Sequence, residues 1–282
     1  MSSPDLHGKT ALVPGAASGI GRATAMAFAR AGADLWLCDI NEPGLVPVAE
    51  QARALGRRVQ TRLTDVSSKE AMRALSDDVH SQIPALDVLV NNAGFAVGGL
   101  FIDTPLEAWE KQIAVNLWGP IYGCHFFTPR MIEYGRGGHI FNIASAAGLF
   151  GTAGLSAYTV TKFALVGLTE SMNIELHRHN IAVTAICPGV IQTNIANATQ
   201  MHGPFADEKL KASVTDFFMS RSQPPERVAE RIVQAMRTRP VIAPITKEAW
   251  ALYTLKRISP ELASLVARKA FEQMERKAFE GK

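Results

Sequence analysis

Short apolar runs alternate with longer amphipathic stretches along most of the chain. The run Lys9–Val13 ends in a glycine-rich turn, and Ile20–Ala31 then carries apolar residues at intervals of three and four, as one face of a helix does. This order recurs, with strands expected at 34–38, 58–63 and 86–90 and helices at 42–55 and 67–82. Consecutive strand–helix units predict a parallel sheet with helices on both faces, an α/β fold of the Rossmann-like, doubly wound class.

The same rhythm continues and then fades after Pro188. We expect a helix at 105–134, a strand at 139–144, a helix at 156–179 and a strand at 181–187. Residues 193–223 show no firm period, so we interpret them as a mobile lid. A helix at 225–236 and a strand at 241–243 would complete the sheet. The prediction is therefore one dinucleotide-binding catalytic domain, residues 1–244, followed by a helical C-terminal extension at 245–282.

Composition excludes several classes of protein. The chain has 282 residues, 47% of them hydrophobic, and a formal charge of +3 without a basic stripe, so nucleic acid is not an expected partner. It has neither a basic, apolar leader nor a run of about 18 apolar residues, so we expect a cytoplasmic protein. Cys38, Cys124 and Cys187 stand far apart in apolar runs. That spacing favours buried, reduced thiols over a disulfide framework or a metal site.

The first turn carries a candidate dinucleotide site. Gly15, Gly19 and Gly21 lie between a strand and a helix, where glycines let the backbone approach a pyrophosphate that the helix N-terminus stabilises. A tight turn without a ligand is the alternative. Asp39 ends the second strand about 20 residues later, where a carboxylate accepts hydrogen bonds from ribose hydroxyls and repels a 2′-phosphate. The turn supplies no Arg or Lys beside it, so NAD is favoured over NADP, although Asp39 could instead cap the next helix.

A candidate catalytic pair follows in the second half. Tyr158 and Lys162 are four residues apart, so their side chains share one face of the predicted helix. An adjacent ammonium and a positive nicotinamide ring both favour a phenolate, which is a general base. The same spacing also occurs on ordinary solvated helix faces. Ser145 strengthens the catalytic interpretation, because it ends the preceding strand at the edge where parallel sheets bind ligands.

Taken together, these motifs resemble the short-chain dehydrogenases/reductases, in particular their retinol and hydroxysteroid dehydrogenase-like members. The resemblance covers about Lys9–Ala243 and rests on six motifs in order. They are Gly15–Gly21, Asn91–Gly94, Asn116, Ser145, Tyr158 with Lys162, and Pro188–Gly189 with Thr193.

The resemblance implies a role for each matching residue. Tyr158 would be the acid/base, Lys162 would lower its pKa and hold the nicotinamide ribose, and Ser145 would bind the substrate oxygen. Asn116 would bend its helix and hold a water that links Lys162 to solvent. The implied cofactor-binding residues are Gly15, Ser18, Gly19, Ile20, Gly21, Asp39, Asp65, Val66, Asn92, Ala93, Gly94, Tyr158, Lys162, Pro188, Gly189, Ile191 and Thr193.

One position departs from the family pattern. Pro14 stands just before Gly15, where relatives usually carry a Thr that ties the turn to its neighbours. Proline removes an N–H and fixes φ, so either stiffness holds the turn or the cofactor binds more weakly.

The expected substrate end is apolar, which favours a small lipophilic alcohol or ketone such as a steroid, retinoid, terpenoid or long-chain alcohol. Lys209, Lys211 and Arg221 of the lid leave an anionic substrate open, and some of the apolar side chains could merely pack the lid. The apolar candidates are Phe95, Val97, Leu149, Phe150, Leu155, Ile195, Met201, Phe205, Phe217 and Phe218.

The C-terminal extension is basic and amphipathic. From Lys247 onward it holds eight Lys or Arg and five Glu, and Pro260 divides two apolar faces. Packing over the cleft or across a subunit boundary is favoured over weak association with a membrane surface. The resemblance also implies a homodimer or homotetramer formed through the helices that contain Asn116 and Tyr158.

Two other functions remain open on this fold. One is a non-catalytic NAD(H)-binding regulator, since a fold alone does not confer catalysis. The other is epimerisation or dehydration of a nucleotide sugar, which the short extension disfavours.

Overall fold

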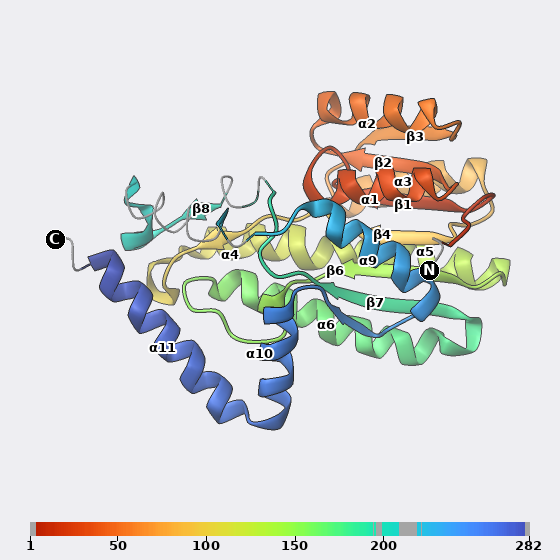
Figure 1. The fold of residues 1–282 in the computed structure, drawn as a ribbon. Coiled ribbons are helices and arrows are strands. Elements are labelled where there is room, and N and C mark those ends of the chain that lie inside the picture. The colour runs from red at the N-terminus through yellow and green to blue at the C-terminus, as the bar shows by residue number, and fades with distance from the viewer. Residues whose placement is uncertain (1–3, 194, 196–198, 209–218, 221, 280–282) are drawn as a thin grey trace.

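The strands form a seven-stranded parallel sheet in the order β3-β2-β1-β4-β6-β7-β9 (Figure 1). A computed structural model describes residues 4–193, 195, 199–208, 219–220 and 222–279. The order reverses between β1 and β4, and in such sheets ligands bind at the carboxyl edge beside the reversal. The strands are β1 (Thr10–Pro14), β2 (Asp34–Asp39), β3 (Val59–Leu63), β4 (Val88–Asn91), β6 (Gly138–Ile143), β7 (Ile181–Cys187) and β9 (Ile242–Pro244).

Helices cover both faces of this sheet, which confirms the predicted fold class. One layer consists of α1 (Gly19–Arg30), α2 (Glu42–Ala54) and α9 (Pro225–Thr238), and the other of α3 (Lys69–Gln82), α5 (Gly119–Tyr134) and α6 (Ser156–Leu176). The expected elements begin and end within about three residues of these bounds.

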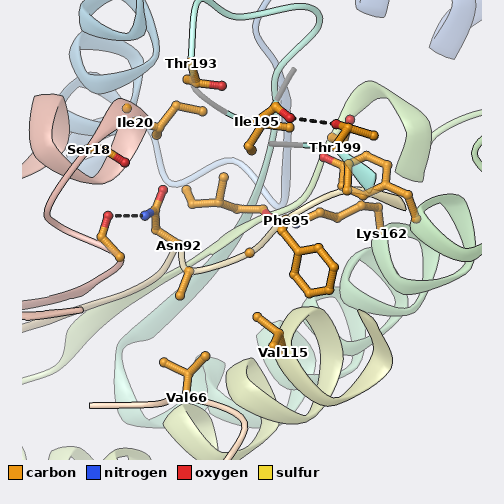
Figure 2. Close-up of a pocket in the computed structure, with 18 of the residues that line it drawn as sticks. Ser18, Ile20, Val66, Asn92, Phe95, Val115, Lys162, Thr193, Ile195 and Thr199 are labelled. Atoms are coloured by element: carbon orange, nitrogen blue, oxygen red, sulfur yellow. Dashed lines mark hydrogen bonds between the residues drawn. The ribbon is translucent and has the colours of Figure 1, made fainter. Parts of the chain in front are cut away.

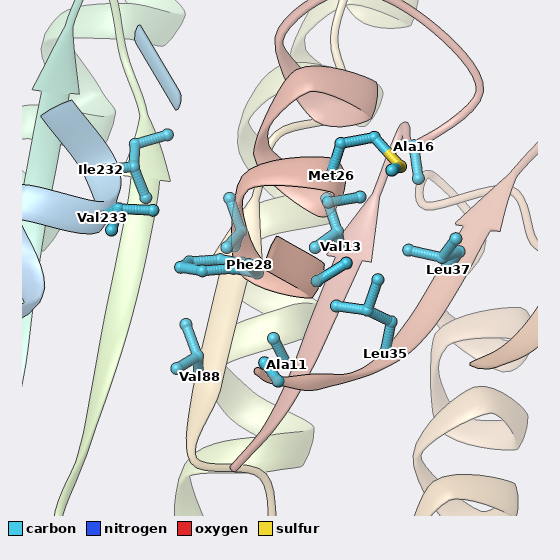
Figure 3. Packing of buried hydrophobic residues seen from close by; sticks show 14 of the residues in the cluster. Ala11, Val13, Ala16, Met26, Phe28, Leu35, Leu37, Val88, Ile232 and Val233 are labelled. Carbon is cyan, nitrogen blue, oxygen red and sulfur yellow. The ribbon is translucent and has the colours of Figure 1, made fainter. Parts of the chain in front are cut away.

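The core lies between the sheet and its helices because the central strands present apolar side chains to both faces. All seven residues of β7 are buried. On one face, Phe28 of α1 is fully buried and points toward Ile232 and Val233 of α9 (Figure 3). Cys38, Cys124 and Cys187 are buried and free, as predicted.

The expected helix at 105–134 is interrupted. It consists of α4 (Leu106–Ile113), a single π-helical turn, η2 (Ala114–Trp118), and α5. Asn116 lies in the middle of the π turn. The irregularity that the family resemblance assigned to Asn116 is therefore present.

A small parallel ribbon, which the periodicity did not indicate, lies beside the main sheet. It pairs β5 (Val97–Gly98) with β8 (Gln200–Met201). The expected lid at 193–223 is described only in part, because 194, 196–198, 209–218 and 221 lie outside the described residues. The remaining short helical turns are η1 (Phe101–Asp103), η3 (Ala146–Gly148), η4 (His177–His179) and η5 (Gly203–Ala206).

The C-terminal extension forms two helices, α10 (Lys247–Ile258) and α11 (Pro260–Phe279), and α11 runs away from the sheet (Figure 1). The extension begins inside the core, since Ile245 and Thr246 are buried and Ile245 N–H donates to the Cys187 carbonyl oxygen. Lys256 of α10 lies 4.2 Å from the ring centre of Phe163 on α6. In the part of the chain that the structure describes, no helix is both long and apolar enough to cross a membrane.

Candidate active site

A cavity of about 710 Å³ opens at the carboxyl edge of the sheet, beside the reversal of strand order (Figure 2). Most of the predicted site residues line it together. They are Gly15, Ser18, Gly19, Ile20, Asp39, Asp65, Val66, Asn92, Ala93, Gly94, Ser145, Tyr158, Lys162, Pro188, Gly189, Ile191 and Thr193. The two predicted residues outside this wall are Gly21 and Asn116.

The glycine turn forms one end of the cavity. Gly15 and Gly19 have φ values of 71° and 53°, which side chains other than glycine rarely adopt. Gly21 lies behind the turn, where a Cβ would overlap the carbonyl oxygen of Gly15, so it shapes the turn without facing the cavity. The first backbone N–H groups of α1 follow this turn. The Ser18 side chain, at the N-cap position, accepts no hydrogen bond from them.

Hydrogen bonds from elsewhere in the fold hold the turn that follows Pro14. The Asn92 side-chain amide donates to the carbonyl oxygens of Pro14 and Gly15 at 3.0 and 3.1 Å. Gly15 N–H donates to the Cys38 carbonyl oxygen at 2.7 Å. The turn is therefore held by its neighbours, and the effect of Pro14 on cofactor binding stays open.

Asp39 does not cap the next helix, because the Asn41 side chain caps α2 by accepting from Gly44 N–H. The two carboxylate oxygens of Asp39 accept from the backbone N–H groups of Ala17 and Asn41, each at 3.0 Å, so Asp39 braces the glycine turn and the start of α2. It also lines the cavity, beside Ile40, which is 72% exposed. Among the described residues that line the cavity, Lys111 and Lys162 are the cationic side chains, and neither is in the glycine turn or in β2.

Tyr158, Lys162 and Ser145 meet at the other end. Lys162 is buried, its ammonium donates to the Ile143 carbonyl oxygen at 2.7 Å, and its Nζ lies 5.5 Å from the Tyr158 ring centre. Ser145 hydrogen-bonds Tyr158, and its hydroxyl oxygen accepts from Ala147 N–H at 3.1 Å. Tyr158, Lys162 and Ser145, to which the family resemblance assigned the catalytic roles, therefore lie together in one wall of the cavity.

Burial controls the proton affinities of this group. Burial raises the pKa of Tyr158, while the Ser145 hydrogen bond lowers it by less and the nearby Cys187 adds to the increase. Burial also lowers the pKa of Lys162 to about 8. Burial therefore outweighs the lowering effect of Ser145 on the pKa of Tyr158, and the expected lowering by Lys162 stays a prediction.

Asn116 acts one layer behind the wall. Its amide oxygen accepts from Phe95 N–H at 3.1 Å and its amide nitrogen donates to Phe95 O at 2.8 Å. Gln112 Nε2 donates to the same carbonyl oxygen at 2.9 Å. Asn116 thereby locks the backbone at Phe95. Its expected link to a water beside Lys162 stays a prediction.

The substrate end contains part of the expected apolar set. Phe95, Leu155, Ile195 and Met201 line the cavity, whereas Val97, Leu149, Phe150 and Phe205 pack elsewhere. Phe217, Phe218, Lys209, Lys211 and Arg221 lie outside the described residues. The sequence interpretation missed several wall residues, which lie between or beside the motifs and carry no pattern of their own. They include Ile40, Thr64, Ser67, Ala96, Lys111, Ala114, Val115, Ala144, Val190, Thr199 and Gln200.

The residues fit a nicotinamide dinucleotide. Gly15, Ser18 and Gly19 line the cavity directly before and at the start of α1, and a helix N-terminus suits a pyrophosphate. Asp39 and Asp65 line the cavity and would hold the adenosine part, while Lys162 would hold the other ribose. Within the described residues, no group of three or more His, Cys, Asp or Glu is placed to hold a metal ion.

Comparisons with known proteins agree with this geometry. The family model described as "short chain dehydrogenase" matches residues 9–202. The "Probable oxidoreductase EphD" of Mycobacterium tuberculosis is 39% identical over 91% of this chain and 44% of its own length, so the chain spans less than half of that relative. The "3beta-hydroxysteroid dehydrogenase 2" of Eggerthella lenta is 34% identical over 80% of this chain and 87% of its own length.

A solved structure has the same fold. A short-chain dehydrogenase/reductase from Burkholderia phymatum in complex with NAD superposes with a TM-score of 0.84 and 28% identity, over 92% of this chain and 96% of that one. The fold and the lining of the cavity agree with one family of proteins. The chain belongs to the short-chain dehydrogenase family.

Proposed function

We propose that this protein interconverts a lipophilic alcohol and its ketone or aldehyde with NAD, and that Tyr158 is the acid/base. The observation that carries the proposal is the convergence of Tyr158, Lys162 and Ser145 in one cavity with the glycine turn and Asp39. The bound nicotinamide would supply the hydride acceptor or donor. The protein then needs only to orient the substrate, move one proton and stabilise charge on one oxygen.

In the oxidising direction, the Tyr158 phenolate takes the proton of the substrate hydroxyl. Ser145 donates to the same substrate oxygen and holds it against the phenol. Because burial raises the pKa of Tyr158, positive charge must favour its ionised form. Lys162 contributes such charge, since with a pKa of about 8 it is largely protonated at neutral pH. In the reducing direction Tyr158 returns the proton.

The wall favours NAD over NADP. The Asp39 carboxylate lies where the adenosine ribose would bind, so a 2′-phosphate would meet like charge. The next residue, Ile40, offers no compensating cation.

A lipophilic substrate is supported by the apolar side chains of the substrate end. Phe95, Leu155, Ile195 and Met201 present hydrocarbon or thioether surface to the cavity. Lys111 adds a positive charge beside these apolar side chains, and its ammonium lies 5.8 Å from the ring centre of Phe95.

The test compares NADH formation from NAD, and NADPH formation from NADP, by the native chain and Tyr158→Phe. The substrates are hydroxysteroid, retinol, terpenoid and aliphatic alcohols. Removal of the phenol should reduce kcat by about 10²- to 10⁴-fold, because proton transfer loses its general base. NADH affinity, measured by fluorescence titration, should remain close to native.

Tyr134→Phe is the matched control, since that phenol lies at the end of α5 and outside the cavity wall. Undiminished turnover in Tyr158→Phe would refute the proposed base. Tight NADH binding with no turnover of any alcohol would instead favour the regulatory alternative.

We also propose a cytoplasmic homodimer or homotetramer that assembles through α5 and α6. The exposed Trp118 at the end of η2, which stacks on the partly buried Tyr122 of α5, supports this proposal. Weak peripheral contact of α10 and α11 with an anionic membrane is a further part of the proposal. It is supported by their basic composition and by exposed apolar side chains such as Trp250 and Leu265.

A further inference from the structure

The ribbon β5–β8 connects three separate segments at the substrate end. Val97 pairs with Gln200 and Gly98 with Met201 in parallel register. His202 N–H donates to the Gly98 carbonyl oxygen at 2.8 Å. Gly99 N–H donates to the Gly154 carbonyl oxygen at 2.9 Å, beside Leu155. The segment that carries Met201 is thus bonded both to the strand after Phe95 and to the residues before α6.

Met201 is seated directly on a glycine in this ribbon. A Cβ at Gly98 would overlap Met201 Sδ and would lie 3.4 Å from its Cε. The same Cβ would lie 3.5 Å from the Thr199 methyl group. Gly98 is buried, and its φ is outside the left-handed region. Glycine is therefore needed here to leave room for Met201, and not to allow an unusual backbone conformation.

This seat restrains a side chain that is ordinarily adaptable. Methionine has three rotatable bonds and usually yields to its surroundings. Here Thr199 stands beside it and is itself held, because its hydroxyl donates to the Ile195 carbonyl oxygen at 2.6 Å (Figure 2). Met201 nevertheless lines the cavity with Phe95 and Leu155. Its side chain is therefore a fixed part of the wall.

We propose that Met201, seated on Gly98, is a specificity-determining residue of the substrate end, which admits a slender apolar chain and excludes a branched or fused-ring group. This inference rests on the proposed function, since it concerns the substrate of the same site. Shortening Met201 removes the obstruction. A methyl group at Gly98 displaces the side chain without adding a polar atom.

The first experiment is a double-mutant cycle on thermal stability with Gly98→Ala, Met201→Ala and the double variant. Gly98→Ala should lower Tm by roughly 2–8 °C when Met201 is present, because the added methyl overpacks the seat. The same substitution should have little effect in the Met201→Ala background, because its clash partner is gone. Gly151→Ala is the matched control, since its Cβ would meet nothing within 4 Å. If Gly98→Ala lowers Tm equally in the native and the Met201→Ala proteins, Met201 is not packed against Gly98 and the proposal is overturned.

The second experiment measures kcat/KM for 2-octanol and for a 3-hydroxysteroid. Met201→Ala should raise the steroid-to-octanol ratio by roughly tenfold or more, which is the scale of discrimination by one apolar pocket contact. An unchanged ratio would overturn the proposal and leave the proposed function intact. If the native chain oxidises neither alcohol, the proposed function loses support.

A binding measurement distinguishes failure of the Met201 proposal from failure of the proposed function. In the NADH-saturated protein, 2-octanone and a 3-ketosteroid are compared by the Tm shift that each produces. Met201→Ala should increase the steroid-induced shift relative to the octanone-induced shift. An equal relative shift in both proteins would overturn the role of Met201 regardless of turnover.

Discussion

At the scale of single residues, Asp39 combines an observed structural role with a proposed role in cofactor selection. Its oxygens accept from Ala17 and Asn41 N–H groups, yet the carboxylate remains partly exposed in the cavity wall. Sequence spacing predicted the position of this charge because strand ends at the carboxyl edge gather at one place. It could not decide between capping and cofactor binding, because both use the same oxygens.

The charge of Asp39 is expected to control the choice of cofactor. Asp39→Asn should lower the ratio of kcat/KM for NAD over NADP by at least about tenfold, because a neutral amide no longer repels a 2′-phosphate. The ratio is the informative measurement, since loss of one backbone hydrogen bond affects both cofactors alike.

Asp34→Asn is a suitable control, because Asp34 begins the same strand at its far end and also accepts a backbone N–H, that of Arg58. A ratio that does not change in Asp39→Asn would mean that another group selects the cofactor.

Tyr158 and Lys162 show a limit of motif interpretation at this scale. Their spacing predicted a shared helix face, and the structure places both in the cavity wall. The pKa values depend on desolvation, which is set by residues distant in sequence. Burial opposes ionisation of both groups, an effect that the sequence interpretation missed.

At the scale of elements, long periodic segments were predictable and short irregular ones were not. The helix around Asn116 was expected, but periodicity alone cannot show that Ala114–Trp118 forms a π turn. The strands β5 and β8 contain two residues each and lie about 100 residues apart in the chain. Their pairing depends on tertiary contacts, so no local pattern indicates it.

An exposed tryptophan lies where η2 meets α5, backed by two partly buried aromatic residues of α5. Trp118 is 47% exposed and stacks on Tyr122 at 5.5 Å, and Tyr122 stacks on Phe126 at 6.3 Å. Exposed tryptophans backed by aromatic neighbours are typical centres of protein interfaces. The surface around Trp118 is therefore the expected subunit contact.

Trp118→Asp should weaken assembly by roughly 30-fold or more in Kd, since loss of a central tryptophan costs at least about 2 kcal/mol. Light scattering across a dilution series would measure the shift toward monomer. Trp250→Asp makes the same change at another exposed tryptophan, which lies on α10. If Trp250→Asp dissociates the protein and Trp118→Asp does not, the extension forms the interface instead.

At the scale of the whole molecule, the fold was largely predictable because each strand–helix unit carries its own periodicity. Central strands such as Ile181–Cys187 are buried on both faces, so their sequences are almost continuously apolar. The boundary between domain and extension was less predictable. Ile245 and Thr246 are buried, so the extension begins within the core and not after it.

One buried histidine links the whole fold to pH. The Thr184 hydroxyl donates to the Pro240 carbonyl oxygen at 2.5 Å, so it accepts from His139 Nε2–H at 2.8 Å. His139 Nδ1 is then the bare acceptor, buried and without a partner among the described residues. Burial, with a smaller effect of Arg239, lowers the pKa of His139 from 6.5 to about 3. The folded protein therefore resists protonation that the unfolded chain accepts.

Because unfolding takes up this proton between pH 6.5 and about 3, His139 should reduce the free energy of unfolding as pH falls through that range. The loss is about 1.4 kcal/mol per pH unit. His139→Gln keeps a donor for Thr184 but cannot titrate, so its stability should fall less steeply with acid. Urea unfolding at pH 7, 6 and 5 would measure the difference, with the exposed His125→Gln as control. Parallel curves for native and His139→Gln proteins would show that the acid sensitivity arises elsewhere, since removing the bare Nδ1 acceptor would then have left the proton uptake unchanged.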